Sequence, residues 1–263
     1  MVIDCHVHLC QVRHEGQTYA QIRDSLLSSM EQSGIDSSCV LADSEPDTPC
    51  SDLDATCKVV MGYPKLKILG SISPLIPDMR PGLDRLDALA RPRAIIGIKL
   101  FPGFELFYPD DEPCHVIYEL CVTHDMPVLY HSGETMGESW REAYNHPTEI
   151  AKVASRFPSL KIIIAHLAQP HLTDCRDLLL STPNLYGDLS SLAYPEIVEF
   201  CGEENIHRVV QDIASKQPEK LLFGTDWPAC EVDDHLQLVH SLDVPDDVQS
   251  MILCENARRI FGL

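Results

Sequence analysis

Short apolar segments alternate with longer amphipathic segments along the whole chain. Two of the short segments, AIIGIKL and KIIIAHL, are almost continuously apolar, which is typical of strands covered on both faces in a parallel sheet. The pattern predicts strands at Val2–His8, Ser38–Asp43, Lys67–Ser73, Ala94–Leu100, Pro127–His131, Lys161–His166, Leu185–Leu189 and Lys220–Thr225.

The segments between these strands have the spacing of amphipathic helices. In Tyr19–Ser33 the side chains of Ile22, Leu26 and Met30 recur on one face, and Gly34 follows as a C-terminal signal. The same pattern predicts helices at Val116–His124, Pro147–Arg156, Leu172–Leu180, Glu196–Lys216, Asp233–Leu242 and Asp246–Phe261.

Eight strands alternating with helices predict an α/β fold, a (β/α)8 TIM barrel with helices at its C-terminus. We expect residues 1–263 to form one domain, since barrels of this length commonly do. A doubly wound open sheet is the alternative. It is disfavoured because no glycine-rich nucleotide-binding motif follows the first strand, where the sequence has His-x-His instead.

Metal-capable side chains occur at the carboxyl ends of the predicted strands. The first strand ends with His6 and His8, which share a face because residues i and i+2 of a strand point the same way. Four later strands end with Lys99, His131, His166 and Asp226. In a barrel these ends meet on one rim, where active sites lie. Imidazole and carboxylate suit Zn²⁺, with Mn²⁺ and Fe²⁺ as alternatives, so the six residues predict a metal site.

Each of these residues taken singly has an ordinary explanation. Histidines at strand ends pair with backbone groups, a lysine such as Lys99 extends toward solvent, and Asp226 could cap a helix. All six residues, however, lie at the same end of the predicted barrel, and this common position favours metal binding over coincidence.

Composition narrows the class of partner. Hydrophobic residues make up 44% and charged residues 23%, which are globular proportions. The net charge of −20 argues against nucleic acid and against an anionic membrane surface. No apolar stretch approaches the ~20 residues of a membrane span. We therefore expect a small-molecule substrate, and a homodimer is left open.

The eleven cysteines are odd in number and form no C-x-x-C pair. This usage predicts reduced, mostly buried thiols. The N-terminal MVIDCHVHL has neither a basic region nor a long apolar run, so no signal peptide is expected. Together these features predict a cytoplasmic protein.

Seven short segments in a fixed order resemble the amidohydrolase superfamily of metal-dependent TIM-barrel hydrolases. The resemblance is to the amidohydrolase-related branch, which also includes nonoxidative decarboxylases. The segments are DCHVHL (4–9), GIKL (97–100), YHSG (130–133), AHLA (165–168), NLYGDLS (184–190), LLFGTDWP (221–228) and ENARRIFGL (255–263).

The resemblance implies a role for each candidate residue. In two-ion members the counterparts of His6, His8 and Asp226 hold one ion, and those of His131 and His166 hold the second. The counterpart of Lys99 is carboxylated and bridges the two. In one-ion members the lysine is often absent or idle, and the histidine at the position of His166 polarises the substrate or moves a proton. The number of ions stays open.

These residues lead to the hypothesis of a metal-dependent hydrolase that uses an activated water on a small amide, ester or lactone. Asp226 would take a proton from the water and return it to the leaving group, and a second ion or His166 would polarise the carbonyl. The alternative is a nonoxidative decarboxylase of a small carboxylic acid. A metal-binding scaffold without turnover and a two-ion phosphoesterase are further readings, the latter disfavoured by the negative charge.

The loops after the fourth and fifth strands, residues 101–113 and 133–145, carry aromatic side chains that could frame a substrate. Arg141 could bind a substrate carboxylate there, although an ordinary surface arginine is the simpler interpretation.

Overall fold

The computed structural model describes residues 1–45, 48–135 and 137–263. Its centre is a parallel sheet in which each strand pairs with the next along the chain, so the predicted TIM barrel is confirmed. The strands are β1 (Ile3–His8), β2 (Ser37–Leu41), β3 (Leu66–Ser71), β4 (Gly97–Leu100), β5 (Val128–Tyr130), β6 (Ile162–Ile164), β7 (Leu185–Asp188) and β8 (Leu221–Leu222).

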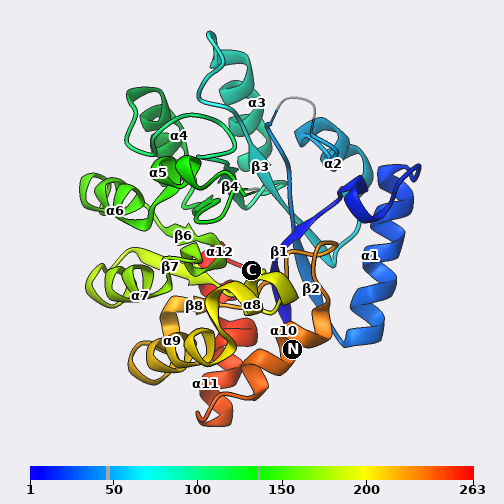
Figure 1. Cartoon of the computed structure of the whole chain (residues 1–263). Coiled ribbons are helices and arrows are strands. Elements are labelled where there is room, and N and C mark those ends of the chain that lie inside the picture. Colours follow the sequence, from blue (N-terminus) through cyan, green and yellow to red (C-terminus); the bar gives the residue numbers. More distant parts are fainter. Residues whose placement is uncertain (46–47, 136) are drawn as a thin grey trace.

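Helices surround the sheet (Figure 1). The α-helices are α1 (Tyr19–Ser33), α2 (Leu53–Val60), α3 (Arg80–Ala90), α4 (Glu112–Thr123), α5 (Glu142–Asn145), α6 (Pro147–Arg156), α7 (Leu172–Ser181), α8 (Pro195–Cys201), α9 (Glu203–Lys216), α10 (Val232–His240), α11 (Asp246–Ser250) and α12 (Asn256–Phe261). Shorter helical segments are η1 (Gln11–Arg13), η2 (Ser139–Arg141), η3 (Ala165–Ala168), η4 (Pro218–Lys220) and η5 (Met251–Glu255). No helix in the described ranges is long and apolar enough to cross a lipid bilayer.

Three helical expectations need correction. The single helix expected over Glu196–Lys216 is two helices, α8 and α9, because Gly202 between them has a φ of 81° that interrupts the helical backbone. The single helix expected over Asp246–Phe261 consists of α11, the π-helical η5 and α12. The expected loop over residues 133–145 contains the short helix α5, and helices α2 and α3 had not been predicted.

Two groups of buried apolar side chains hold the barrel together. The larger group lies between the strands and the outer helices. The smaller group faces the interior of the barrel, where Leu41, Leu69 and Leu129 pack with Ile260 and Phe261 of α12. Figure 1 shows α12 and the C-terminus near the centre of the ring. The terminal helix therefore closes the amino-terminal end of the barrel and leaves the carboxyl-terminal end for the site.

A change of register in β1 affects the direction of the Cys5 side chain. The pairing of β1 with β2 shifts between Asp4 and Val7, as at a β-bulge. Cys5, which the strict alternation of a strand directs away from His6 toward the outer helices, instead packs in the interior group. The bulge allows Cys5 and His6, although adjacent in sequence, both to face the inside of the barrel.

The cysteines are not all reduced. Cys10 and Cys50 form a disulfide between the segments that follow β1 and β2. The other nine cysteines are free, and all of them except the half-buried Cys201 are buried. The expectation of reduced thiols was therefore wrong for one pair, because Cys10 and Cys50 are 40 positions apart and only the fold brings them together. The cytoplasmic location stays a prediction.

Candidate metal centre

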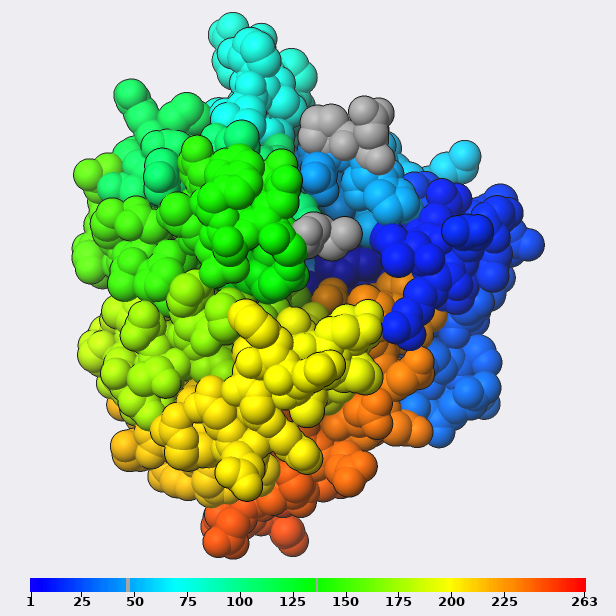
Figure 2. All heavy atoms as spheres, in the orientation of Figure 1, coloured from blue at the N-terminus to red at the C-terminus, as the bar shows by residue number. Residues whose placement is uncertain are grey.

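A cavity of about 500 Å³ opens at the carboxyl-terminal end of the barrel. Figure 2 shows the corresponding hollow between residues coloured blue, green and yellow. The structure brings all six candidate residues to this cavity, which is lined by His6, His8, Lys99, His131, His166 and Asp226 together with mostly apolar wall residues.

Three of these residues have the spacing of a metal site. His6 Nε2 lies 3.2 Å from His8 Nε2 and 3.6 Å from Asp226 Oδ1, and His8 Nε2 lies 3.5 Å from the same oxygen. Ligands about 2.0–2.1 Å from a tetrahedral Zn²⁺ are separated from one another by roughly 3.3–3.4 Å. The three ligand atoms therefore fit around one ion of this size and leave a fourth position open toward the cavity.

Two of the site residues are placed by unusual backbone conformations. Asp226 lies four residues beyond β8 with a φ of 71°, and its backbone N–H donates to His6 O at 2.8 Å. His166 follows β6 in η3 with a φ of 58°. Residues other than glycine rarely adopt positive φ, at a cost of about 1–3 kcal/mol each, and such strain is concentrated at functional sites. The strands expected to carry Asp226 and His166 end before them, because the chain turns to bring both side chains over the barrel.

Asp188, at the end of β7, connects the two sides of the site. Its Oδ2 accepts a hydrogen bond from His6 Nδ1 at 2.8 Å, and its Oδ1 accepts from the backbone N–H of His166 at 2.9 Å and from Ser190. Asp188 therefore orients His6 and His166, and its ligand atom and theirs also lie within 4.8 Å of one another. Asp188 was not among the predicted site residues, although it lies next to the last residue of the predicted strand Leu185–Leu189 on the same rim.

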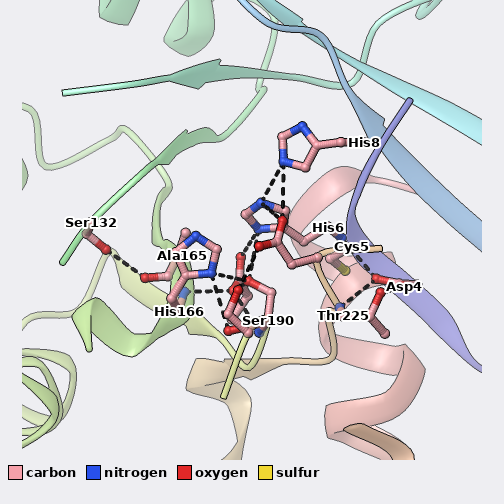
Figure 3. Close-up of polar contacts among 12 residues, drawn as sticks. Asp4, Cys5, His6, His8, Ser132, Ala165, His166, Ser190 and Thr225 are labelled. Atoms are coloured by element: carbon pink, nitrogen blue, oxygen red, sulfur yellow. Dashed lines mark hydrogen bonds and ion pairs between the residues drawn. The ribbon is translucent and has the colours of Figure 1, made fainter. Parts of the chain in front are cut away.

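Three of the histidines each use one ring nitrogen for a partner outside the six candidate residues. The Nδ1–H of His6 donates to Asp188, and the Nε2–H of His131 donates to the carbonyl oxygen of Glu134 at 3.0 Å. His166 Nδ1 donates to Ser190 Oγ at 2.8 Å, because the hydroxyl proton of Ser190 goes to Asp188. Figure 3 shows His6, His166 and Ser190 meeting at this network. Outer partners of this kind fix the tautomer of metal-binding histidines.

Burial keeps these histidines neutral. It lowers the pKa of His8 to about 3, with a further contribution from the nearby Lys99 charge, and it lowers the pKa of His131 to about 3 for the same reasons. The pKa values of His6 and His166 are also well below the usual range, mainly through burial. A neutral imidazole has the lone pair that a cation requires, so no proton has to be displaced at physiological pH.

Two ionisable side chains titrate closer to neutrality. Burial raises the pKa of the Asp226 carboxyl to about 6, against the opposing effects of a 2.6 Å hydrogen bond from Ser191 Oγ and of the Lys99 charge. Burial also lowers the pKa of Lys99 to about 8, opposed by Asp188 and Asp226. Both groups can therefore exchange a proton near neutral pH.

The wall of the cavity carries Arg141. Its guanidinium donates to the carbonyl oxygens of Gly103 and Phe104 at 3.2 Å and pairs with the carboxylate of Glu138. The arginine is therefore more than an isolated surface charge, since it ties the loop after β5 to the loop after β4. The aromatic residues Phe101 and Phe104 lie on the same wall.

The profile of one protein family, described as amidohydrolase, matches residues 3–263. The chain belongs to this family. No curated protein sequence is detectably similar to it.

Solved structures with the same fold cover nearly the whole chain. An uncharacterized TIM-barrel protein from Bordetella bronchiseptica is 18% identical, with a TM-score of 0.80 over 99% of this chain and 98% of its own. A probable 2-pyrone-4,6-dicarboxylic acid hydrolase from Acinetobacter baumannii is 16% identical, with a TM-score of 0.69 over 100% and 99%. A 5-carboxyvanillate decarboxylase from Novosphingobium aromaticivorans, solved with manganese, is 16% identical, with a TM-score of 0.67 over 99% and 95%. At these identities the likeness establishes the fold and not the reaction.

Proposed function

We propose that this amidohydrolase-family protein is a metal-dependent hydrolase of a small amide, ester or lactone. The observation that carries the proposal is the spacing of His6 Nε2, His8 Nε2 and Asp226 Oδ1, which matches three corners of a tetrahedron beside an open cavity. We propose Zn²⁺ as the ion because it favours two imidazoles and a carboxylate, with Mn²⁺ or Fe²⁺ as alternatives.

A cation held there would supply Lewis acidity, which acidifies a water molecule and polarises a carbonyl oxygen. Asp226 would hold and return the proton. Its Oδ1 faces His6 and His8, its Oδ2 accepts from Ser191, and its raised pKa of about 6 lies near the operating range of a general base and acid.

In this proposal His166 is a ligand of a second ion. Because its Nδ1–H is held by Ser190, the other nitrogen, Nε2, carries a lone pair and accepts rather than donates. This favours His166 as a ligand, with His131, of a second ion over His166 as a hydrogen-bond donor to the substrate carbonyl. The lowered pKa of Lys99 would favour its carboxylation, since the neutral amine is the nucleophile toward carbon dioxide. Metal content measured with and without bicarbonate separates one ion from two.

Asp226→Asn tests the hydrolase mechanism. We expect a loss of turnover of at least about 10³-fold with unchanged circular dichroism, because the amide cannot accept the proton. Asp233→Asn, on the exposed face of α10, is the matched control and should retain full activity. A variant Asp226→Asn that hydrolyses its best substrate at the wild-type rate would remove this residue from the mechanism.

A nonoxidative decarboxylase is the second candidate, favoured by the manganese-bound decarboxylase of the same fold. A panel of lactones, esters, amides and aromatic carboxylic acids in ¹⁸O-labelled water distinguishes the two. Hydrolysis places the label in a product carboxylate, whereas decarboxylation releases carbon dioxide and leaves a new C–H bond. The substrate is a small molecule in either case, and a homodimer stays a prediction that light scattering can check.

A further inference from the structure

A second group of metal-capable side chains lies outside the catalytic cavity, where helices α6 and α7 begin. It consists of His146, His171 and Asp174, whose ligand atoms all lie within 4.8 Å of one another. None of these three residues lines the cavity that contains His6 and Asp226.

The starts of two packed helices position the group. His146 is the N-cap of α6, and His171 is the N-cap of α7. Asp174 lies three residues after His171 in the first turn of α7, a spacing that places two side chains on the same side of a helix. The two imidazole rings are 4.4 Å apart between centroids, and His146 Nε2 lies 3.7 Å from Asp174 Oδ2. The three side chains therefore converge from regular elements and not from one flexible loop.

Both imidazoles are oriented through their outer nitrogens. His171 Nε2 lies 2.9 Å from Glu142 Oε2, to which it donates, and its Nδ1 has no hydrogen-bond partner among the described residues. The backbone N–H of Thr148 donates to His146 Nδ1 at 3.3 Å, and Thr148 Oγ1 lies 2.8 Å from the same nitrogen. His146 Nε2 faces Asp174, and a cation bound there would displace the proton that the neutral ring carries on Nε2. The carboxylate of Glu142 on His171 repeats the arrangement of Asp188 on His6, the usual way in which proteins orient metal-binding histidines.

Ion pairing explains some of the contacts in this group but not the close approach of the two imidazole rings. It explains the contact of His171 with Glu142, but two protonated imidazoles would repel each other at this ring separation. A cation between the three side chains would account for the whole group, because their ligand atoms all lie within 4.8 Å of one another.

We propose that His146, His171 and Asp174 form a second divalent-cation site, separate from the catalytic centre, for an ion of the Zn²⁺ class. Two imidazoles and one carboxylate form a ligand set that suits this ion. A cation there would join the start of α6 to the start of α7. Through Glu142 it would also steady η2 and α5, the segment whose Glu138 and Arg141 line the catalytic cavity.

The experiment uses a protein that lacks one histidine ligand of each of the two proposed catalytic ions. Zn²⁺ is titrated into the double variant His6→Ala/His166→Ala by calorimetry, and one equivalent is expected to bind with a Kd of about 10 μM or tighter. Adding His146→Ala should abolish this binding. Adding His207→Ala instead is the matched control and should leave it intact, because this half-buried histidine only contacts Ser241 O on another part of the surface. The thermal midpoint should rise by several degrees on Zn²⁺ addition only in the variants that bind.

Two results would overturn the proposal: no binding by the double variant at 100 μM Zn²⁺, or equal binding after His146→Ala. If circular dichroism shows that the double variant is unfolded, the zinc content of the Zn²⁺-saturated protein with all its catalytic ligands decides. His146→Ala should then lower it by one equivalent relative to the wild type, and an unchanged content contradicts the site. Turnover is not a readout in either experiment, so failure here leaves the proposed hydrolase untouched.

Discussion

At the scale of single residues, Asp188 shows how the site depends on a group that binds neither substrate nor ion in our proposal. Its two oxygens receive hydrogen bonds from different sides, from His6 on one oxygen and from His166 and Ser190 on the other. His131 and Asp226 were identified because they are polar side chains near the end of a predicted strand. The same criterion applies to Asp188. Its role as an orienting group follows only from its contacts.

We expect Asp188→Asn to weaken Zn²⁺ binding by about 10- to 100-fold, the usual effect of losing such an outer partner. The amide has one oxygen only, so its NH₂ group must face either His6 Nδ1–H or the backbone N–H of His166. A competition titration with a chromophoric chelator measures the affinity. Asp177→Asn, on the exposed face of α7, is the control and should bind as the wild type does. Wild-type affinity in Asp188→Asn would show that the contact does not orient His6.

Two glycines in the loop after β5 form a matched pair. Gly133 and Gly137 both have positive φ, 84° and 77°. A Cβ on Gly133 would lie 1.8 Å from Gln169 O, whereas a Cβ on Gly137 would have nothing within 4 Å.

We therefore expect Gly137→Ala to lower the free energy of unfolding by about 1–2 kcal/mol, the cost of the left-handed conformation alone. Gly133→Ala should lower it by about 4 kcal/mol or more, because the backbone must also move. Urea denaturation measures both. Equal losses would mean that the loop after β5 shifts freely away from η3.

At the scale of elements, the seam between β8 and β1 is the least regular part of the barrel. β8 has only the residues Leu221–Leu222, and the chain beyond it is held to β1 by Asp4. The carboxylate of Asp4 accepts hydrogen bonds from Thr225 Oγ1 at 2.7 Å and from the backbone N–H groups of Thr225 and His6 at 3.1 Å. Asp4 thus closes the barrel directly beneath the metal centre.

Asp4→Ala should lower the free energy of unfolding by about 3 kcal/mol or more, because it leaves buried donors without partners at about 1–3 kcal/mol each. Asp36→Ala is the control. Asp36 accepts a 2.7 Å hydrogen bond from Val2 N at the other end of β1, but it is exposed, and its loss should cost less than about 1 kcal/mol. Chemical denaturation of both variants gives the comparison. A cost for Asp4→Ala no greater than for Asp36→Ala would mean that the seam does not depend on this carboxylate.

The elements themselves were predictable to different degrees. The positions of the strands could be predicted from their apolar runs, because a strand that is buried on both faces consists almost entirely of apolar residues. Helix α2 has only eight residues, and α3 begins with Pro81 and Gly82, two residues that usually mark turns, so neither helix was predicted. The break between α8 and α9 at Gly202 depends on a positive φ that the apolar pattern does not reveal.

At the scale of the whole molecule, one disulfide coexists with nine free cysteines. The disulfide between Cys10 and Cys50 lines the cavity that contains the candidate metal centre. Among the free cysteines, burial raises the pKa of the Cys114 thiol to about 12 and also raises that of Cys121. Because the thiolate is the reactive form, buried thiols of this kind react slowly.

We expect Ellman's reagent to detect at most one fast thiol, Cys201, in the native protein. It should detect nine in denaturant and eleven after reduction. Eleven thiols in denaturant without a reductant would contradict the disulfide. Several fast thiols in the native protein would contradict the burial of the others.

The sequence by itself determined the barrel and the six residues at its carboxyl-terminal rim, because an alternation of apolar strands and helices permits few arrangements and places every strand end on one rim. Only the tertiary structure decided the rest. Three features bring together segments that are far apart in the sequence: the contacts of Asp188, the disulfide, and the group of His146, His171 and Asp174. A fourth feature, the bulge in β1, changes the direction of the Cys5 side chain, which the local sequence does not reveal. Distances between such groups are set by packing in three dimensions, and no periodicity along the chain encodes them.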